Sequence, residues 1–264
     1  MAVCSAARET GSFLRTERES FDEGRIEQKH SHDYVSYVDK SAEERLVEQL
    51  RKILPEAGFV TEEGLAGKSS ETYWWVVDPL DGTTNFIHRN LPYAVSVALR
   101  TACEVLLGVI YDATADECFY AWKDGGAYLN GKSISVNKSH TIDSALLCLE
   151  LPYNVNAYKT FALQLINHFY GRAGGIRMNG SAAVALAHVA AGRLDGWIER
   201  YIGFWDYMAG LIIIREAGGK VTDFKGKEFC IDDVDIVASN GVIHDDLVEQ
   251  TREFDRLAEK KTIV

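Results

Sequence analysis

The sequence contains little proline and no long apolar run, and each shortage excludes a class of protein. Only four prolines occur in 264 residues, and no low-complexity tract or fixed-period repeat is present, which excludes collagen-like and solenoid folds. The longest apolar runs, such as Met208 to Ile214, are far shorter than the roughly 20 residues that cross a bilayer. We therefore expect a globular protein with no membrane partner, built as a single unit of two packed lobes over residues 1–150 and 151–264.

Cysteine is also scarce and is not grouped. The five cysteines are odd in number and scattered, without CxxC or histidine–cysteine ligand spacing, which indicates reduced thiols rather than a disulfide framework or a zinc site. The first 20 residues lack the basic region of a signal peptide. These features predict a cytoplasmic protein.

Basic residues are outnumbered by acidic residues. The chain has 28 lysines and arginines against 39 aspartates and glutamates, a formal net charge of −11. This charge repels nucleic acid and anionic membranes at long range, and no basic run with interleaved aromatics offsets it. We therefore expect a small-molecule partner and no nucleic-acid partner.

The order of helical and strand patterns predicts layered α and β structure. Helical spacing covers residues 2–18, and Ser41 to Glu44 resembles a capping box that opens a second helix ending before Pro55. Short β-branched and aromatic segments between residues 73 and 136 predict a mostly antiparallel sheet. The remaining expected elements are helices at 158–170, 181–191, 205–217 and 245–258, and strands at 194–199, 220–222 and 235–238.

The segment WWVVDPLDGTTNF, residues 74–86, places two acids directly after an apolar run. The run predicts a strand buried on both faces, with Asp78 at its carboxyl end, where ligands bind in layered α/β proteins. The following proline turns the chain and can bring Asp78 and Asp81 together, while Gly82 allows close backbone approach. Free amides at residues 82–84 suit an anion. The pattern predicts a metal and a phosphate; a strand end capped by aspartate remains the alternative.

Two further acidic groups lie elsewhere in the chain. Glu62 and Glu63 precede the apolar run, Glu199 ends an expected strand, and Asp206 lies in the first turn of an apolar helix. Each group alone is more typical of a solvated loop or a helix N-terminus, where the helix dipole favours a carboxylate. Together with Asp78 and Asp81 they favour a shared site.

These motifs resemble the inositol monophosphatase family over nearly the whole chain. The resemblance rests on Thr61-Glu62-Glu63, on DPLDGTTNF at residues 78–86, on GSAA at 180–183, on WDxxAG at 205–210 and on EAGG at 216–219, all in the family's order. It implies a layered αβαβα sandwich with a mostly antiparallel first sheet and a mixed second sheet. It also implies a homodimer, lithium sensitivity and Mg²⁺-dependent hydrolysis of phosphate monoesters.

The resemblance also implies roles for single residues. Glu62, Asp78 and the carbonyl of Leu80 match ligands of a first metal, and Asp78, Asp81 and Asp206 match ligands of a second. A weaker third metal would face Glu62, with Asp39 assisting through water, while Lys29 and Asp33 receive no role. The positions that match contacts to the substrate are Asp81, Gly82, Thr83, Gly180, Ser181, Ala182, Glu199 and Asp206.

Charge arithmetic supports two to three Mg²⁺ ions in this site. Glu62, Asp78, Asp81 and Asp206 carry four negative charges and a phosphate dianion carries two more, which repel at close range unless cations are present. An all-oxygen ligand set without histidine or cysteine suits Mg²⁺ better than zinc.

The expected reaction is in-line displacement at phosphorus. A metal-bound water oriented by Glu62 and Thr83 attacks, while the second metal and the amides of Gly82 and Thr83 stabilise the transferring group. Asp81 belongs to the same catalytic set. Inositol monophosphate is the expected substrate; fructose 1,6-bisphosphate and histidinol phosphate are alternatives, and Arg172 and Arg177 are candidates to bind a second phosphate. A non-catalytic regulatory protein with this fold is the alternative from another class.

Overall fold

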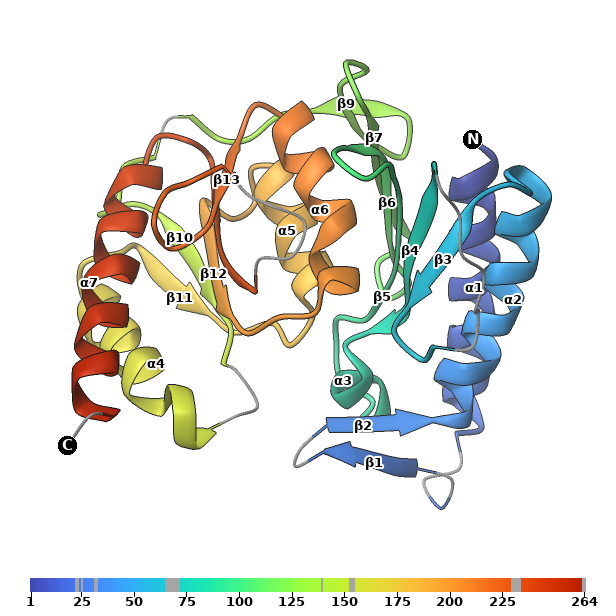
Figure 1. Ribbon diagram of the computed structural model, residues 1–264, viewed down its shortest axis with the longest axis horizontal. Helices are drawn as coiled ribbons and strands as arrows, with labels where there is room; N and C mark the ends of the chain where they lie inside the picture. Colours follow the sequence, from blue (N-terminus) through green and yellow to red (C-terminus); the bar gives the residue numbers. More distant parts are fainter. Residues whose placement is uncertain are drawn as a thin grey trace.

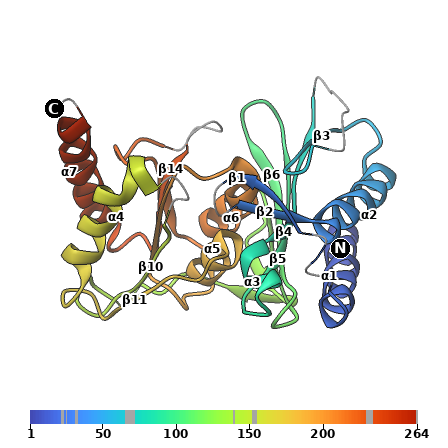
Figure 2. The ribbon, with the colours of Figure 1, turned by 90° about the horizontal axis from the view of Figure 1, so that it is seen from below.

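The chain folds into five alternating layers of helices and sheets. The computed structural model describes residues 1–21, 24, 26–30, 33–64, 72–138, 140–151, 155–228 and 234–262. Two outer helix pairs enclose two β-sheets, and a third helix pair lies between the sheets (Figure 1). The view from below shows the same five layers (Figure 2). The layered αβαβα sandwich predicted from the sequence is confirmed.

The first sheet has seven strands and is mostly antiparallel. Its strands in spatial order are β3 (Gly58–Thr61), β4 (Trp74–Asp81), β5 (Ala94–Arg100), β6 (Val105–Asp112), β7 (Glu117–Trp122), β8 (Ala127–Leu129) and β9 (Lys132–Ile134). Only the β3–β4 pair is parallel. Its central strands are covered by helices on both faces, which explains why β4 is an unbroken apolar run until its acids.

The second sheet has five strands and is mixed. Its spatial order is β11 (Gly175–Arg177), β10 (Leu146–Leu149), β12 (Gly196–Arg200), β14 (Asp235–Ser239) and β13 (Lys220–Thr222). Strand β10 runs parallel to both of its neighbours, whereas β14 is antiparallel to β12 and to β13. The carboxyl ends of β11, β10 and β12 therefore lie at one edge of the sheet.

The helices differ in how much of their surface is apolar. The outer pairs are α1 (Ala2–Glu19) with α2 (Tyr37–Ile53), and α4 (Val155–Phe169) with α7 (His244–Thr262). The inner pair, α5 (Ala182–Ala190) and α6 (Phe204–Glu216), is almost entirely buried between the sheets. Because these two helices have no solvent-facing side, their sequences are apolar all round. Within the described residues, no helix is long and apolar enough to cross a bilayer.

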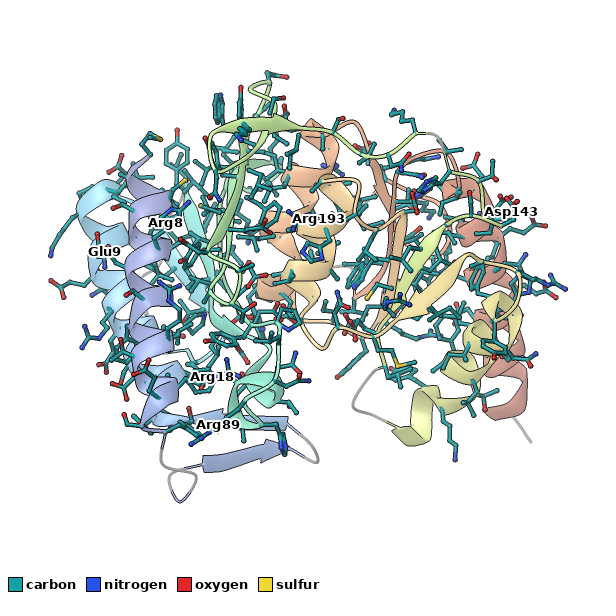
Figure 3. The ribbon with its side chains drawn as sticks, turned by 180° about the vertical axis from the view of Figure 1, so that it is seen from behind. Arg8, Glu9, Arg18, Arg89, Asp143 and Arg193 are labelled. Atoms are coloured by element: carbon teal, nitrogen blue, oxygen red, sulfur yellow. The ribbon has the colours of Figure 1, made fainter. Side chains whose placement is uncertain are left out.

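Two arginines join the layers on either side of the first sheet (Figure 3). Arg8 of α1 donates to Asp116, just before β7, over 2.9 Å and also to Asn130, just after β8. Arg193, which follows α5, donates to Glu117 of β7 through both terminal nitrogens, one over 2.6 Å. The seven-stranded sheet is thus tied to its outer and inner helix layers.

Several elements differ from the sequence predictions. The second helix begins at Tyr37, because the Ser36 side chain accepts from the Val38 N–H and the Asp39 carboxylate accepts from the Ser36 N–H. The predicted start at Ser41 is therefore wrong, and Glu44 lies inside the helix. The elements that the sequence patterns did not predict are β3, β10, β11, the short helix α3 (Thr83–Ile87) and the hairpin of β1 (Ile26–His30) with β2 (Asp33–Ser36).

Candidate metal centre and active site

Strand β4 places two carboxylates on one side of the first sheet. The strand does not end at Asp78, as the sequence suggested, but continues through Asp81. Its pairing with β5 shifts register between Asp78 and Asp81. In a regular strand, residues three apart point to opposite faces, so this irregularity is what allows both side chains to reach the same site. The Leu80 N–H donates to Asp78 Oδ1 over 2.9 Å and fixes the bend.

The third carboxylate comes from the first turn of α6. The Gly203 N–H donates to Asp206 Oδ2 over 3.1 Å, so Asp206 caps the helix on which it lies. Ser96 of β5 donates to the Trp205 carbonyl over 3.2 Å and holds the start of α6 against the sheet. One oxygen each of Asp78, Asp81 and Asp206 then lie within 4.8 Å of one another. We call these three residues the acidic cluster.

Burial and mutual repulsion disfavour the ionised forms in this cluster. Burial, followed by the charges of Glu62, Asp206 and Asp81, raises the pKa of Asp78 well above its ordinary value. Burial, and then the charge of Asp81, does the same to the pKa of Asp206. Burial also raises the pKa of Asp81 to about 6, although hydrogen bonds from Ser181 and from the Ala182 and Ala183 amides counteract it. Buried like charges of this kind call for a cation.

Glu62 lies beside the acidic cluster, just beyond the end of β3. Its N–H donates to the Val77 carbonyl over 3.1 Å, which continues the parallel pairing of β3 with β4. A fully buried carboxylate of α2, Glu43, supports this turn by accepting from the Thr61 hydroxyl over 2.7 Å and from the Glu63 N–H over 2.9 Å. Glu43 was not identified from the sequence, because its partners lie far along the chain.

Asp81 also binds the N-terminus of α5. Its Oδ2 atom accepts from the Ser181 hydroxyl and, over 2.9 Å, from the Ala183 N–H. Ser181 is itself the N-cap of α5, and its hydroxyl oxygen accepts from Val184. Ser181 is 1% exposed, so its hydroxyl is committed to Asp81. The sequence predicted that Ser181 contacts substrate; in this structure it orients a carboxylate of the cluster.

A second set of contacts surrounds the turn after β4. The Thr83 hydroxyl lies 3.0 Å from Asp39 Oδ1 and 3.0 Å from the Leu80 carbonyl oxygen. Asp39, the third residue of α2 and the partner of the N-cap Ser36, is therefore part of the site's surroundings. Gly82 has φ of +93°, and a Cβ atom there would lie 2.9 Å from the Pro92 carbonyl oxygen. Only glycine fits this turn without strain.

Asn85 connects the same turn to the segment before α5. Its amide nitrogen donates over 2.8 Å to the carbonyls of Pro92 and of Asn179, and it lies 3.3 Å from the Gly180 carbonyl. Gly180, with φ of +67°, packs against the Asn85 amide. The GSAA segment, the Gly82 turn and the acidic cluster are therefore assembled around one side chain whose role the sequence did not show.

Glu199 and Glu150 extend the acidic region away from the cluster. Burial, and then the charges of Glu150, Asp206 and Asp81, raises the pKa of Glu199 well above its ordinary value. Glu150 directly follows β10 and was not identified from the sequence. Arg172 and Arg177 do not point to this region: Arg177 donates to the Ile176 carbonyl, and the charge of Arg172 acts on His168 at the end of α4.

The donor set fits a hard divalent cation. All three cluster ligands are carboxylate oxygens, with Glu62 and the Leu80 carbonyl beside them, and Mg²⁺ prefers such oxygens at about 2.0–2.1 Å. Opposite ligands of such an ion lie roughly 4.2 Å apart, which is compatible with cluster oxygens that lie within 4.8 Å of one another.

The sequence matches the inositol monophosphatase family over residues 1–256. The chain belongs to this family. Nus factor SuhB of Escherichia coli (strain K12) is 38% identical over 236 residues, which cover 89% of this chain and 88% of that protein. A fructose-1,6-bisphosphatase/inositol-1-monophosphatase of Thermotoga maritima is 37% identical over 221 residues, covering 84% and 83%.

The fold agrees with solved structures of family members. The crystal structure of extragenic suppressor protein suhB from Bartonella henselae superimposes with a TM-score of 0.88 at 34% identity, covering 94% of this chain and 95% of that one. Family membership supports a phosphatase, and the acidic cluster provides a place where a metal can bind.

Proposed function

We propose that this protein is an Mg²⁺-dependent phosphatase that hydrolyses inositol monophosphate. The observation that carries the proposal is the convergence of Asp78, Asp81 and Asp206 from β4 and α6 within 4.8 Å. Asp78 and Asp81 are buried and Asp206 is half-buried, the three acids repel one another, and they lie at the residues where the family's motifs occur. A structural role alone does not account for three unneutralised carboxylates in one place.

The proposed metal ligands are the acidic cluster and the positions that match ligands of the family. Asp78, Asp81 and Asp206 would hold one ion, and Asp78 with Glu62 and the Leu80 carbonyl would hold another, with a third ion next to Glu62. When bound, Mg²⁺ supplies positive charge to the phosphate and lowers the pKa of water. Hydrogen bonds from the N-terminus of α5 to Asp81 Oδ2 restrict the orientation of this side chain.

The chain's own groups would position the reacting atoms. The Thr83 hydroxyl directs its hydrogen to Asp39 or to the Leu80 carbonyl, so its lone pairs remain able to accept a hydrogen bond from the attacking water. Glu62, beside the cluster, would orient the same water. Gly82 is the N-cap of α3 and Thr83 is its first residue, so their N–H groups lack partners within that helix. These N–H groups would donate to the phosphate oxygens.

The alcohol part of the substrate would lie toward α5 and β12. Gly180, Ser181 and Ala182 at the start of α5 and Glu199 at the end of β12 border this space. Glu199 would accept a hydrogen bond from a substrate hydroxyl. We also propose a homodimer, a cytoplasmic location and lithium sensitivity, on the basis of family resemblance.

Fructose 1,6-bisphosphate is the second candidate substrate, because the Thermotoga maritima relative is named for both activities. Histidinol phosphate is a further one. A non-catalytic role is the competing function, and a relative named as a Nus factor gives it a basis. The complete acidic cluster favours catalysis, because a protein that only binds partners has no need to retain it.

Release of inorganic phosphate tests the proposal. The purified protein is incubated with inositol 1-phosphate, fructose 1,6-bisphosphate, histidinol phosphate and 3′-phosphoadenosine 5′-phosphate, each with Mg²⁺ or with a chelator. We expect Mg²⁺-dependent release that is fastest with inositol 1-phosphate. No release from any ester above the chelator background would reject the phosphatase, and a different best ester would reject the substrate.

A further inference from the structure

Three parallel strands end side by side next to the acidic cluster. In the register of the sheet, Leu149 of β10 lies opposite Ile198 of β12, and Cys148 lies opposite Arg177 of β11. One residue further along each strand, Glu150 therefore lies opposite Glu199 on the β12 side and opposite Asn179 on the β11 side. The Glu150 N–H donates to the Ile198 carbonyl over 3.1 Å and continues the pairing. Ligands of layered α/β proteins bind at such carboxyl ends.

Glu150 is held firmly in this position. Its Oε1 atom accepts from the Asn179 N–H over 2.7 Å, from the Gly180 N–H over 3.1 Å and from the Cys148 thiol over 3.2 Å. Ser181, which follows Gly180 in the chain, donates its hydroxyl hydrogen to Asp81 of the cluster. Glu150 thus lies one short segment from the proposed metal site, and its charge helps to raise the pKa of Asp81.

Glu199 lies opposite Glu150 on the neighbouring strand β12. Its Oε2 atom is buried and has no hydrogen-bond partner among the described residues. The arginine next to it in the chain, Arg200, instead pairs with Asp255 at 2.6 Å and Asp235 at 3.3 Å on the other face of the sheet. Two like charges opposite each other on neighbouring strands are destabilising, so this arrangement has a cost that a ligand can offset.

We propose that Glu150 and Glu199 form a two-carboxylate subsite for the alcohol part of the substrate, and that Glu150 determines specificity there. The subsite accepts hydroxyl or ammonium donors and rejects a second phosphate. This inference rests on the proposed function and makes it more specific: the enzyme takes monophosphates of hydroxylated or amine-bearing alcohols rather than bisphosphates.

The physical reason is that the subsite, with both carboxylates ionised, offers only acceptors and negative charge. A substrate hydroxyl or ammonium group satisfies the unpartnered Glu199 oxygen. A second phosphate dianion brings acceptors alone and is repelled by both carboxylates at short range. Among the described residues, Glu150 Oε1 is bound by two backbone amides and a thiol, and Glu199 Oε2 has no partner, so neither oxygen is paired with a basic side chain.

The substitution Glu150→Gln removes the negative charge of this side chain but keeps its hydrogen-bond acceptor in place. The glutamine oxygen can still accept from the Asn179 and Gly180 N–H groups, whereas Glu150→Ala removes the acceptor as well. In Mg²⁺, we expect Glu150→Gln to increase kcat/KM for fructose 1,6-bisphosphate relative to inositol 1-phosphate by about tenfold, in line with removal of one nearby charge. Calorimetry should show the bisphosphate binding correspondingly tighter to Glu150→Gln than to the natural protein.

A surface substitution, Glu48→Gln on α2, is the matched control and should leave the substrate ratio unchanged. An unchanged ratio and unchanged bisphosphate affinity in Glu150→Gln would overturn the inference, as would a change seen only in Glu150→Ala, which would show a purely positional role. Failure of the natural protein to hydrolyse any ester would instead reject the proposed function, and the calorimetric comparison would still decide the subsite.

Discussion

The carboxylate of Asp81 belongs to the acidic cluster and also caps the N-terminus of α5. One of its oxygens lies in the acidic cluster, and Oδ2 accepts from Ser181 and Ala183 at the start of α5. A side chain held at one end is restricted in rotation, which prepares the other end for a metal. This explains why a carboxylate whose pKa burial raises to about 6 is retained there.

Asp81→Asn tests this arrangement. The amide oxygen can still accept from α5, so we expect the fold to persist while one metal ligand is lost. Substitution of residues that only orient metal ligands already costs about 10- to 100-fold, so kcat/KM should fall at least about 100-fold and Mg²⁺ should bind more weakly. Phosphate release and Mg²⁺ titration measure the two effects.

Asp143→Asn serves as the control for this substitution, because Asp143 is exposed and lies far from the first sheet, which carries Asp81 (Figure 3). Circular dichroism and urea unfolding of both variants verify folding. Near-normal Mg²⁺-dependent turnover in a folded Asp81→Asn protein would remove Asp81 from the proposed metal site.

The site residues found from the sequence are those with local signals. Asp78 and Asp81 follow an apolar strand, and Asp206 opens an apolar helix, so each acid is conspicuous where it stands. Glu43 and Glu150 have no such signal. Their partners lie 20 and 29 positions away, and only the packing of α2 on β3, or of β10 beside β11, brings them into contact.

The distance between α6 and β6 depends on a glycine. A Cβ atom at Gly108 of β6 would lie 2.5 Å from the Ala209 carbonyl oxygen and 2.7 Å from Ile212 Cγ2. Helix α6 therefore packs closely on the sheet through backbone as well as side chains. Because α6 carries Asp206 and the sheet carries Asp78, this contact sets the geometry of the acidic cluster.

Gly108→Ala should push α6 away from the sheet. Overpacking of this kind costs about 1–3 kcal/mol of unfolding free energy, and the displaced Asp206 should weaken Mg²⁺ binding several-fold. Urea unfolding and Mg²⁺ titration measure both. Gly175→Ala in the edge strand β11 is the control, since its Cβ would meet the end of the Leu146 side chain at 3.1 Å. Equal effects of the two substitutions would contradict the assigned role of the α6 contact.

Elements with long periodic patterns were predicted, and the missed elements are mostly short, although the three-residue strand β13 was predicted at 220–222. The helices at 2–18 and 205–217 and the strands of the meander correspond to α1, α6 and β4 to β9. Strands of three or four residues, such as β10 and β11, are too short to show a period. The start of α2 was misplaced because Ser41 to Glu44 matches a capping pattern inside the helix, whereas the true cap, Ser36, follows a strand.

The stability of the whole molecule should depend on His244. Its ring lies between Thr222 Oγ1 at 2.9 Å and Ser239 Oγ at 2.8 Å, and the residue is 1% exposed. Burial, followed by the charge of Lys220, lowers its pKa to about 4, although Asp245 acts in the opposite direction. Between about pH 4 and the ordinary histidine pKa of about 6.5, the unfolded chain therefore binds a proton that the folded chain does not.

Stability should therefore fall as pH decreases from about 6.5 to about 4, by at most roughly 3 kcal/mol from this residue. Urea unfolding at several pH values measures the slope. His244→Gln should flatten the slope in this window, whereas substitution of the exposed His88 by glutamine should not. An unaltered slope in His244→Gln would show that other groups control the acid sensitivity.

Mg²⁺ should stabilise the complete fold, because its ligands come from both predicted lobes. Asp78 and Asp81 precede residue 150, and Asp206 follows it, so unfolding of either part destroys the cluster. Without a cation the three acids of the cluster repel one another. A ligand that binds only the folded state stabilises it by about 2.7 kcal/mol at 100 times its Kd.

Thermal unfolding with and without Mg²⁺ should show a higher midpoint with the ion. The shift should be retained in Asp143→Asn and greatly reduced in Asp81→Asn. An equal shift in all three proteins would mean that Mg²⁺ binds elsewhere.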